Sequence, residues 1–153
     1  MLSHTLKNTG KQAIETNVYN HNFFVMDQQP ISSDFVIIFP FTLTSETAGT
    51  QELGRLMENK ILFDRELINN EHLFYSPLKG YSNSAKDYDI KIENRKTGAG
   101  VRIIGDQPLS KLVFWSTPKT VCPEPYIHIS IAPGETAVWN ITYQFYSTDP
   151  SLK

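Results

Sequence analysis

The sequence lacks the features that mark an exported, membrane-spanning or nucleic-acid-binding protein. Its single cysteine, Cys122, cannot form an internal disulfide, and the N-terminal stretch MLSHTLKNTGKQ has no apolar core of a signal peptide. The longest apolar runs, such as FVIIFPF, are too short to span a bilayer. The net charge is −2, without any block of Lys and Arg. We therefore expect a cytoplasmic protein with no nucleic-acid or membrane partner.

Motifs for cofactors and metals are also missing. There is no glycine-rich loop for phosphates and no Gly-x-Ser-x-Gly turn. The four histidines do not have the spacing of metal ligands, and Cys122 has no second cysteine beside it. No cationic residue flanks Cys122 in the sequence to activate its thiol as a nucleophile. We expect a protein that uses neither a cofactor nor a metal.

What the sequence contains instead is a series of short β-strand patterns. With 153 residues, 40% of them hydrophobic, the chain is long enough for one domain with a real core. Alternating or β-branched and aromatic runs are separated by turn clusters such as KNTGK and APGE. The strands are expected at about 2–7, 13–19, 22–27, 34–43, 60–64, 72–76, 87–94, 100–105, 111–116, 126–131 and 136–147. This spacing predicts an all-β fold, an antiparallel β-sandwich or barrel over residues 1–153. Residues 45–60 contain glycines and no apolar stripe, and we expect them to form a loop.

The first candidate for chemistry is Glu124, which stands between two prolines before the YIHISI strand. Each proline restricts the backbone of the residue before it and favours an extended chain. If the extended register continues through Pro125, Glu124 lies on the same face as Tyr126 and His128, because side chains alternate across a strand. The alternative is an ordinary solvated loop glutamate.

A second candidate is His21, in the stretch NVYNHNFFVMD. Histidine exchanges protons near neutral pH, so it suits acid–base catalysis. The alternative is a histidine at a strand end, hydrogen-bonded to its flanking asparagines. Glu71 and His72 form a third candidate at a strand start, although adjacent strand residues face opposite sides.

Taken together, three segments resemble the aldose 1-epimerase (galactose mutarotase-like) family. The first, LKNTGKQAIETNVYNHNFF, is similar to the family's strand that leads into a His-x-[Tyr/Phe]-Phe motif. The second is NNEHLFY with PLKGYS. The third, KLVFWSTPKTVCPEPYIHISIAPGETAVWNITYQFY, resembles the C-terminal stretch, in which a Trp precedes a Glu-Pro element, a Pro-Gly-Glu turn and an aromatic last strand.

The resemblance implies a galactose mutarotase-type β-sandwich that interconverts the α and β anomers of an aldose. In that chemistry a carboxylate takes the proton of the C1 hydroxyl while a histidine protonates the ring oxygen, without metal or cofactor. Carried over to this chain, Glu124 is the general base and His21 the general acid. Glu71 falls where the family has an Asp that contacts a sugar hydroxyl. The substrate-binding wall is then formed by Trp115, Tyr126 and His128.

The chain departs from the family in two respects. Asn22 follows the histidine where the family has Pro, and the sequence resembles only the C-terminal half of the family, opening at Met1 on a mid-fold strand. Exposed sheet edges favour pairing with another chain, so we expect a homo-oligomer. Two alternatives to catalysis stay open: a non-catalytic carbohydrate-binding or structural remnant of the fold, and a plain interaction module. The sequence does not indicate which sugar is bound, or whether it is phosphorylated.

Overall fold

The computed structural model describes residues 1–46 and 52–148, and nearly all of its regular structure is β-strand, as the sequence predicts. The only other element among these residues is a short 3₁₀ turn, η1 (Ala85–Asp87). The strands are β1 (Leu2–Lys7), β2 (Ile14–Val18), β3 (Phe35–Ile38), β4 (Thr44–Ser45), β5 (Gly54–Met57), β6 (Lys60–Phe63), β7 (Leu73–Lys79), β8 (Asp89–Asn94), β9 (Ala99–Gly105), β10 (Lys111–Ser116), β11 (Val121–Ile131) and β12 (Thr136–Ser147).

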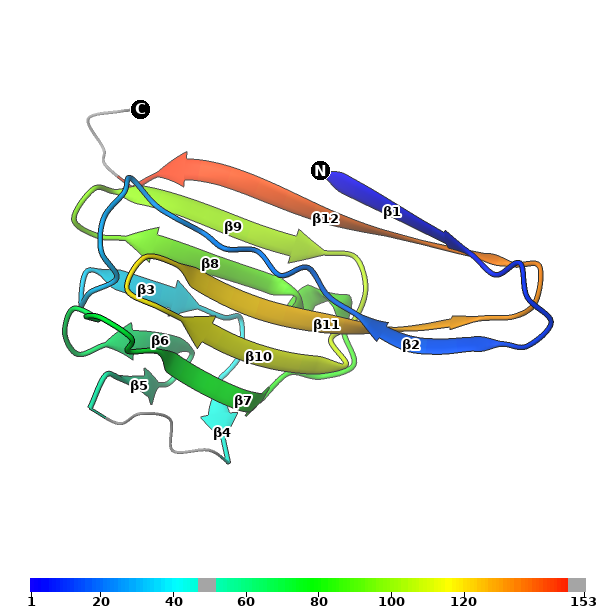
Figure 1. Cartoon of the computed structure of the whole chain (residues 1–153), viewed down its shortest axis with the longest axis horizontal. Helices are drawn as coiled ribbons and strands as arrows, with labels where there is room; N and C mark the ends of the chain where they lie inside the picture. The colour runs from blue at the N-terminus through cyan, green and yellow to red at the C-terminus, as the bar shows by residue number, and fades with distance from the viewer. Residues whose placement is uncertain (47–51, 149–153) are drawn as a thin grey trace.

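The strands form two antiparallel sheets that pack face to face (Figure 1). The larger sheet has the order β1-β12-β9-β8-β3-β6-β5, and the smaller has the order β2-β11-β10-β7-β4. The predicted all-β sandwich is therefore confirmed. Within the described residues, no helix has the length and apolar character needed to cross a bilayer.

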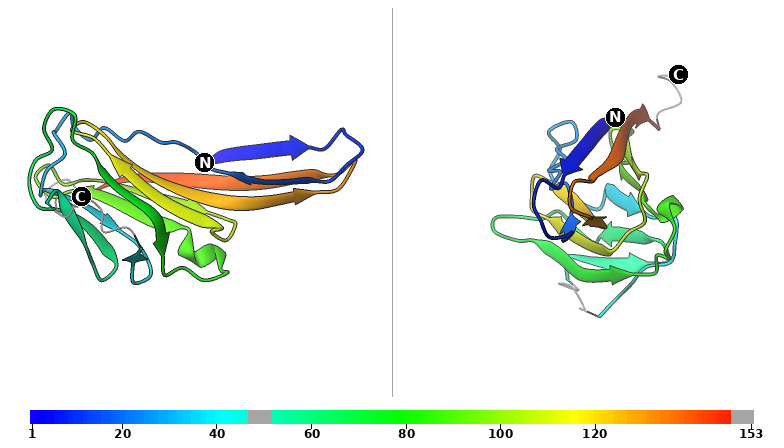
Figure 2. Two further views of the ribbon diagram at one scale, coloured as in Figure 1. Left: turned by 60° about the horizontal axis from the view of Figure 1, so that its bottom comes forward. Right: turned by 90° about the vertical axis from the view of Figure 1, so that its right-hand side faces the viewer.

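One end of the sandwich extends into a narrow arm (Figures 1 and 2). There β1 pairs with the first half of β12, from Leu2 opposite Ile141 to Lys7 opposite Thr136. On the other layer, β2 pairs with the last part of β11, from Ile14 opposite Ile131 to Val18 opposite Ile127. The two ends of the chain are thus tied to each other through the last hairpin.

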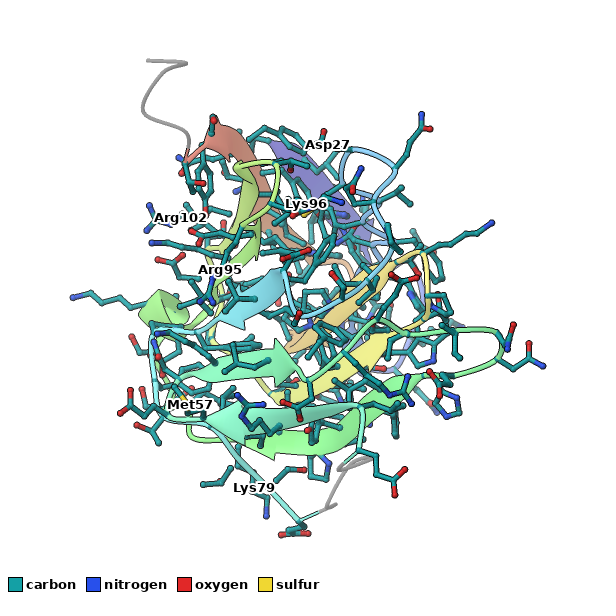
Figure 3. The ribbon with its side chains drawn as sticks, turned by 90° about the vertical axis from the view of Figure 1, so that its left-hand side faces the viewer. Asp27, Met57, Lys79, Arg95, Lys96 and Arg102 are labelled. Atoms are coloured by element: carbon teal, nitrogen blue, oxygen red, sulfur yellow. The ribbon has the colours of Figure 1, made fainter. Side chains whose placement is uncertain are left out.

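The core lies between the sheets and is built from the inward-facing half of each strand. Ile37, Ile61, Ile90 and Leu112 are completely buried, and Phe114 lies with them. Figure 3 shows the layers end on, with Arg102 on β9 and Lys79 on β7 on the outside of their respective sheets. Because alternate residues of a strand point to opposite faces, one face of each sheet is left for solvent or for a binding site.

The expected boundaries differ from the structure in four main places. The strand expected at 34–43 is much shorter, since β3 covers only Phe35–Ile38. The stretch predicted as a strand at 22–27 makes only an isolated bridge between Phe24 and Val121. Part of the expected loop at 45–60 is strand, since Gly54–Met57 forms a hairpin with β6, while residues 47–51 lie outside the described residues. Most importantly, β11 begins at Val121 rather than near 126, so the Pro-Glu-Pro element lies inside the strand.

Two buried tyrosines give a matched test of the core. Tyr75 and Tyr88 are each 2% exposed, but the Tyr75 hydroxyl donates to the Gly54 carbonyl at 3.0 Å whereas the Tyr88 hydroxyl has no hydrogen-bond partner among the described residues. We expect Tyr75→Phe to lower the free energy of unfolding by about 1–2 kcal/mol, because it removes a buried bond. Tyr88→Phe removes an unsatisfied hydroxyl and should leave that free energy unchanged or raised. Chemical denaturation of both variants measures the difference, and equal losses would show that Tyr88 is satisfied in solution.

Candidate functional site

The site lies where the chain after β2 continues alongside β11. The register that pairs Val18 with Ile127 is the same register that pairs Phe24 with Val121. Between these points the segment of residues 19–23 runs past β11 without ladder hydrogen bonds, yet keeps its alignment. His21 therefore falls directly opposite Glu124.

The two prolines explain this gap in the ladder. Phe24 and Val121 exchange both backbone bonds, at 3.0 and 3.1 Å, so the amides of the odd-numbered residues of β11 point toward this segment. Pro123 and Pro125 occupy the next two such positions and have no N–H to donate. The N–H of Asn22 instead donates to the carbonyl of Asn20 at 3.1 Å. The ladder to β10 uses the even-numbered residues and is unaffected, so the prolines open one side of β11 only.

The structure brings together the two residues that the sequence predicts as catalytic. His21 Nε2 lies 3.3 Å from Glu124 Oε1. The Glu124 side chain is only 10% exposed and the His21 side chain is 40% exposed, so the carboxylate is reached from the histidine side. Their catalytic roles remain predictions, but Glu124 is not the solvated loop residue that was the alternative.

Cys122 completes a three-residue cluster that the sequence did not indicate. Its Sγ lies 3.0 Å from His21 Nδ1, on the side of the imidazole opposite to Glu124. Burial, with a smaller effect of the Glu124 charge, raises the pKa of the Cys122 thiol to about 12. The sulfur therefore carries its proton at neutral pH and lies within hydrogen-bond distance of Nδ1. In the tautomer in which Nδ1 accepts from the thiol, the ring hydrogen is on Nε2 and faces Glu124.

Aromatic side chains surround the cluster on the outer face of the smaller sheet. Tyr19 stacks on Tyr126, with ring centroids 4.1 Å apart, and Phe23 stacks on His21 at 4.3 Å. Trp115, from the facing position on β10, meets the rings of both His21 and Phe23 edge-on. Phe23 is 55% exposed, although aromatic groups are usually buried. An exposed aromatic surface beside a His–Glu pair is typical of a binding site.

Tyr126 links the aromatic surface to Glu124. Burial raises the pKa of its hydroxyl, and hydrogen bonds with Tyr19 and Glu124 add to the effect. The phenol therefore stays protonated as a hydrogen-bond donor. The ammonium group of Lys111 lies over the ring, 5.1 Å from its centroid, which places one positive charge at the edge of the site.

Trp115 also borders a pocket of about 320 Å³ together with Glu71 and His72. Of the predicted substrate-binding residues, Trp115 and Tyr126 thus lie at the cluster, and Glu71 lies across the pocket. Both oxygens of the Glu71 carboxylate are already engaged, because Arg65 donates to each at 2.7 Å and the Ile68 amide donates to one at 2.9 Å. These bonds, with that of Arg65 first, lower the pKa of Glu71 to about 2.

His128 shares the face but is distant from the cluster. It lies four residues along β11 from Glu124, which is about 13 Å in an extended strand. Its Nε2 lies 2.9 Å from Glu15, whose other oxygen accepts from the Ser130 hydroxyl at 2.5 Å. The face was predicted correctly, and a role for His128 in substrate binding stays a prediction.

Sequence reasoning missed Tyr19 and Phe23, and it considered Cys122 only as a weak nucleophile, without its contact with His21. A signal for the last two exists: Tyr19, His21 and Phe23 alternate with Asn20 and Asn22, so all three share one face. The side-chain amides of the two asparagines point the other way and donate to the Tyr143 hydroxyl, at 3.4 and 2.8 Å. No sequence signal joined Cys122 to His21.

The order thiol–imidazole–carboxylate also occurs in hydrolases with a nucleophilic cysteine. Such a thiol needs a lowered pKa and access to its substrate. Cys122 is completely buried and its pKa is raised to about 12. The arrangement therefore favours a thiol that orients the imidazole over one that attacks a substrate.

Comparison with known proteins supports the fold. No protein-family model matches the chain, and no curated protein matches its sequence. Among solved structures, the protein Slr1438 from Synechocystis sp. PCC 6803 is similar, with a TM-score of 0.58 at 12% identity. The match covers 96% of this chain and 50% of that one, so the chain spans about half the length of this structural relative. At this identity the likeness extends to the fold alone.

The state of the Cys122 thiol can be measured directly. In the folded protein we expect alkylation by iodoacetamide at pH 8 to be slower than in the denatured chain by roughly 10³-fold, because the raised pKa reduces the thiolate fraction by that factor. The rate should keep rising with pH toward 12 instead of levelling off near neutrality. Mass spectrometry of timed samples gives the rates. A rapid reaction that saturates near pH 7 would indicate an activated nucleophile.

Proposed function

We propose that this protein is an acid–base sugar isomerase of the aldose 1-epimerase kind. The observation that carries the proposal is the direct pairing of His21 with Glu124, across 103 positions of sequence, on an aromatic face of the sheet. The resemblance of the sequence to the galactose mutarotase-like family points to the same two residues. The substrate class that fits is a free or phosphorylated aldose.

The pair suits the proton transfers that ring opening requires. The C1 hydroxyl and the ring oxygen of a sugar are both bonded to one carbon, so a base and an acid that are neighbours reach both from one side. Glu124 takes the proton of the C1 hydroxyl, and His21 gives a proton to the ring oxygen as the C1–O5 bond breaks. After rotation about C1–C2, the carbonyl re-closes with the roles reversed. The contact of 3.3 Å between the two side chains must open for the sugar to enter between their polar atoms.

The surroundings supply a binding surface for the rest of the ring. Trp115, Phe23 and Tyr126 present apolar faces for the C–H groups of a sugar, and Lys111 provides a donor at the edge. The pocket of about 320 Å³ beside Trp115 adjoins another of about 620 Å³, with Asn69 and Pro118 common to both. These volumes lie within the range of small-molecule sites.

Substitution of the two residues tests the proposal. We expect Glu124→Gln and His21→Ala each to slow anomer interconversion by roughly 10²–10⁴-fold, which is the usual contribution of one general acid or base. Polarimetry or saturation-transfer NMR on freshly dissolved α-glucose, α-galactose and their 6-phosphates measures the rate with and without protein.

The matched control is Glu135→Gln, which removes a carboxylate from an exposed turn far from the site. It should keep the wild-type rate, and circular dichroism should show that all variants are folded. Wild-type protein that binds a sugar without accelerating its equilibration would instead favour a non-catalytic carbohydrate-binding protein. If the protein neither binds any of these sugars nor accelerates their equilibration, the proposal is refuted and an interaction module is favoured.

We also propose that the chain self-associates, with the arm as the contact. Strands β1 and β2 each form one edge of a sheet, and such edges offer unpaired backbone groups to another strand. Leu2 and Val138, which lie on the arm, are 50% and 56% exposed. Light scattering over a wide concentration range should show a particle larger than one chain, and charge substitutions at both residues should weaken the association. A monomer at every concentration would contradict it.

A further inference from the structure

The three side chains of the cluster also form a set of metal ligands. One ligand atom from each of His21, Cys122 and Glu124 can be chosen so that all three lie within 4.8 Å of one another. We propose that this cluster binds a divalent transition metal ion of the zinc type, through the sulfur, one imidazole nitrogen and one carboxylate oxygen. We further infer that the bound ion inhibits the acid–base pair, a consequence that rests on the proposed function.

The donor set selects the class of ion. Sulfur, nitrogen and oxygen donors together suit zinc and its neighbours in the first transition row, whereas magnesium and calcium prefer oxygen alone. When the ion binds, it displaces the proton of the Cys122 thiol to solvent. The resulting thiolate and the Glu124 carboxylate carry two negative charges, which balance a divalent ion, with the imidazole neutral. Three protein ligands leave a fourth tetrahedral position open to water or to a sugar hydroxyl.

The geometry requires one side chain to move. Bonds of about 2.0–2.3 Å at tetrahedral angles place ligand atoms about 3.3–3.8 Å apart. The present separations are 3.0 Å from Sγ to Nδ1 and 3.3 Å from Nε2 to Oε1. Two different nitrogens now face the two partners, so the imidazole must shift until one nitrogen meets both.

The backbone permits that shift. Cys122 and Glu124 are two residues apart on β11 and are fixed by its ladder with β10, where they face Trp115 and Val113. His21 belongs to the segment that the prolines leave without ladder bonds, and its side chain is 40% exposed. Two ligands are thus held on a rigid strand, and the third adjusts without loss of sheet hydrogen bonds.

A neighbouring donor supports the carboxylate ligand. Tyr126 lies two residues after Glu124 on the same face of β11, and its phenol stays protonated as a hydrogen-bond donor. Donors of this kind orient metal ligands and stabilise their charged forms, and their loss weakens binding. The surface pair of His128 and Glu15 has a similar separation, 2.9 Å, but it has no thiol partner among the described residues, and both side chains are more than half exposed. It provides the matched control.

The experiment uses the whole chain, freed of metal with a chelator and kept reduced. Cobalt(II) serves as a spectroscopic probe, because a cobalt–thiolate bond gives a charge-transfer absorption in the near ultraviolet. We expect one cobalt per chain with that absorption, and displacement of cobalt by zinc. Calorimetry with zinc should give the same stoichiometry, and magnesium should not bind.

Variants assign the ligands. Cys122→Ser should abolish the charge-transfer absorption, and Cys122→Ser and Glu124→Gln should each weaken zinc binding by more than about 100-fold. Glu15→Gln should bind as the wild type does. Because a variant can misfold, thermal melting is measured too: zinc should raise the Tm of the wild type and of Glu15→Gln but not that of Cys122→Ser. No thiolate absorption in the wild type, or unchanged zinc affinity in Cys122→Ser, would overturn the site.

The activity measurement separates this inference from the proposed function. If the protein accelerates anomer interconversion, zinc should slow it and a chelator should restore it; full activity with zinc bound would overturn the inhibitory role. If no sugar is turned over while cobalt binds through Cys122, the proposed function fails and the metal site stands.

Discussion

The geometry of the His21–Cys122–Glu124 cluster depends on two backbone hydrogen bonds that cannot form. Pro123 and Pro125 lack amide hydrogens at consecutive positions of β11 that face the segment of residues 19–23. A sheet normally closes its ladder at every such position, and the side chains above it then pack as ordinary neighbours. Here the ladder is interrupted while the register is kept, because bonds on either side of the gap hold the alignment. His21 is therefore placed opposite Glu124, at a point where no backbone hydrogen bonds join the two chain segments.

The interruption separates rigid from adjustable parts. Cys122, Glu124 and Tyr126 are fixed from the β10 side, so their spacing is set by the strand itself. His21 is held by side-chain contacts, namely the thiol, the carboxylate and the ring of Phe23. A site that admits a ligand between two polar groups needs fixed and movable parts. Groups fixed in advance lower the free-energy barrier of a reaction, and one movable side chain lets the ligand enter. Both the proposed proton transfer and the proposed metal coordination require this property.

Much of the fold could be predicted from the sequence. Alternation in YIHISI and AVWNITYQFYS located the last hairpin and its two faces, because a strand buried on one side must alternate. The pairing of His21 with Glu124 was predicted only through the family resemblance; no local pattern specifies which distant strands lie side by side.

The predicted start of β11 was wrong because a proline usually marks a strand boundary. Here the ladder to residues 19–23 is absent at the two prolines, and the ladder to β10 does not use their amides. Cys122 was considered only as a weak nucleophile, because its contact with His21 joins residues 101 positions apart in the sequence. Glu71 was expected at the same site as Trp115. The sequence did not reveal the turn that lets Arg65 donate hydrogen bonds to both oxygens of the Glu71 carboxylate.

The arm has a consequence for how the protein acquires its structure. Strand β1 pairs with β12 and β2 pairs with β11, so segments from the first twenty residues find their partners more than a hundred positions later. Contacts of such long range slow folding, because the entropy of closing the intervening loop is lost before the pairing is gained. During synthesis, residues 2–18 emerge before β11 and β12, with which they pair. His21 and Glu124 can therefore meet only after the chain has been made through residue 124.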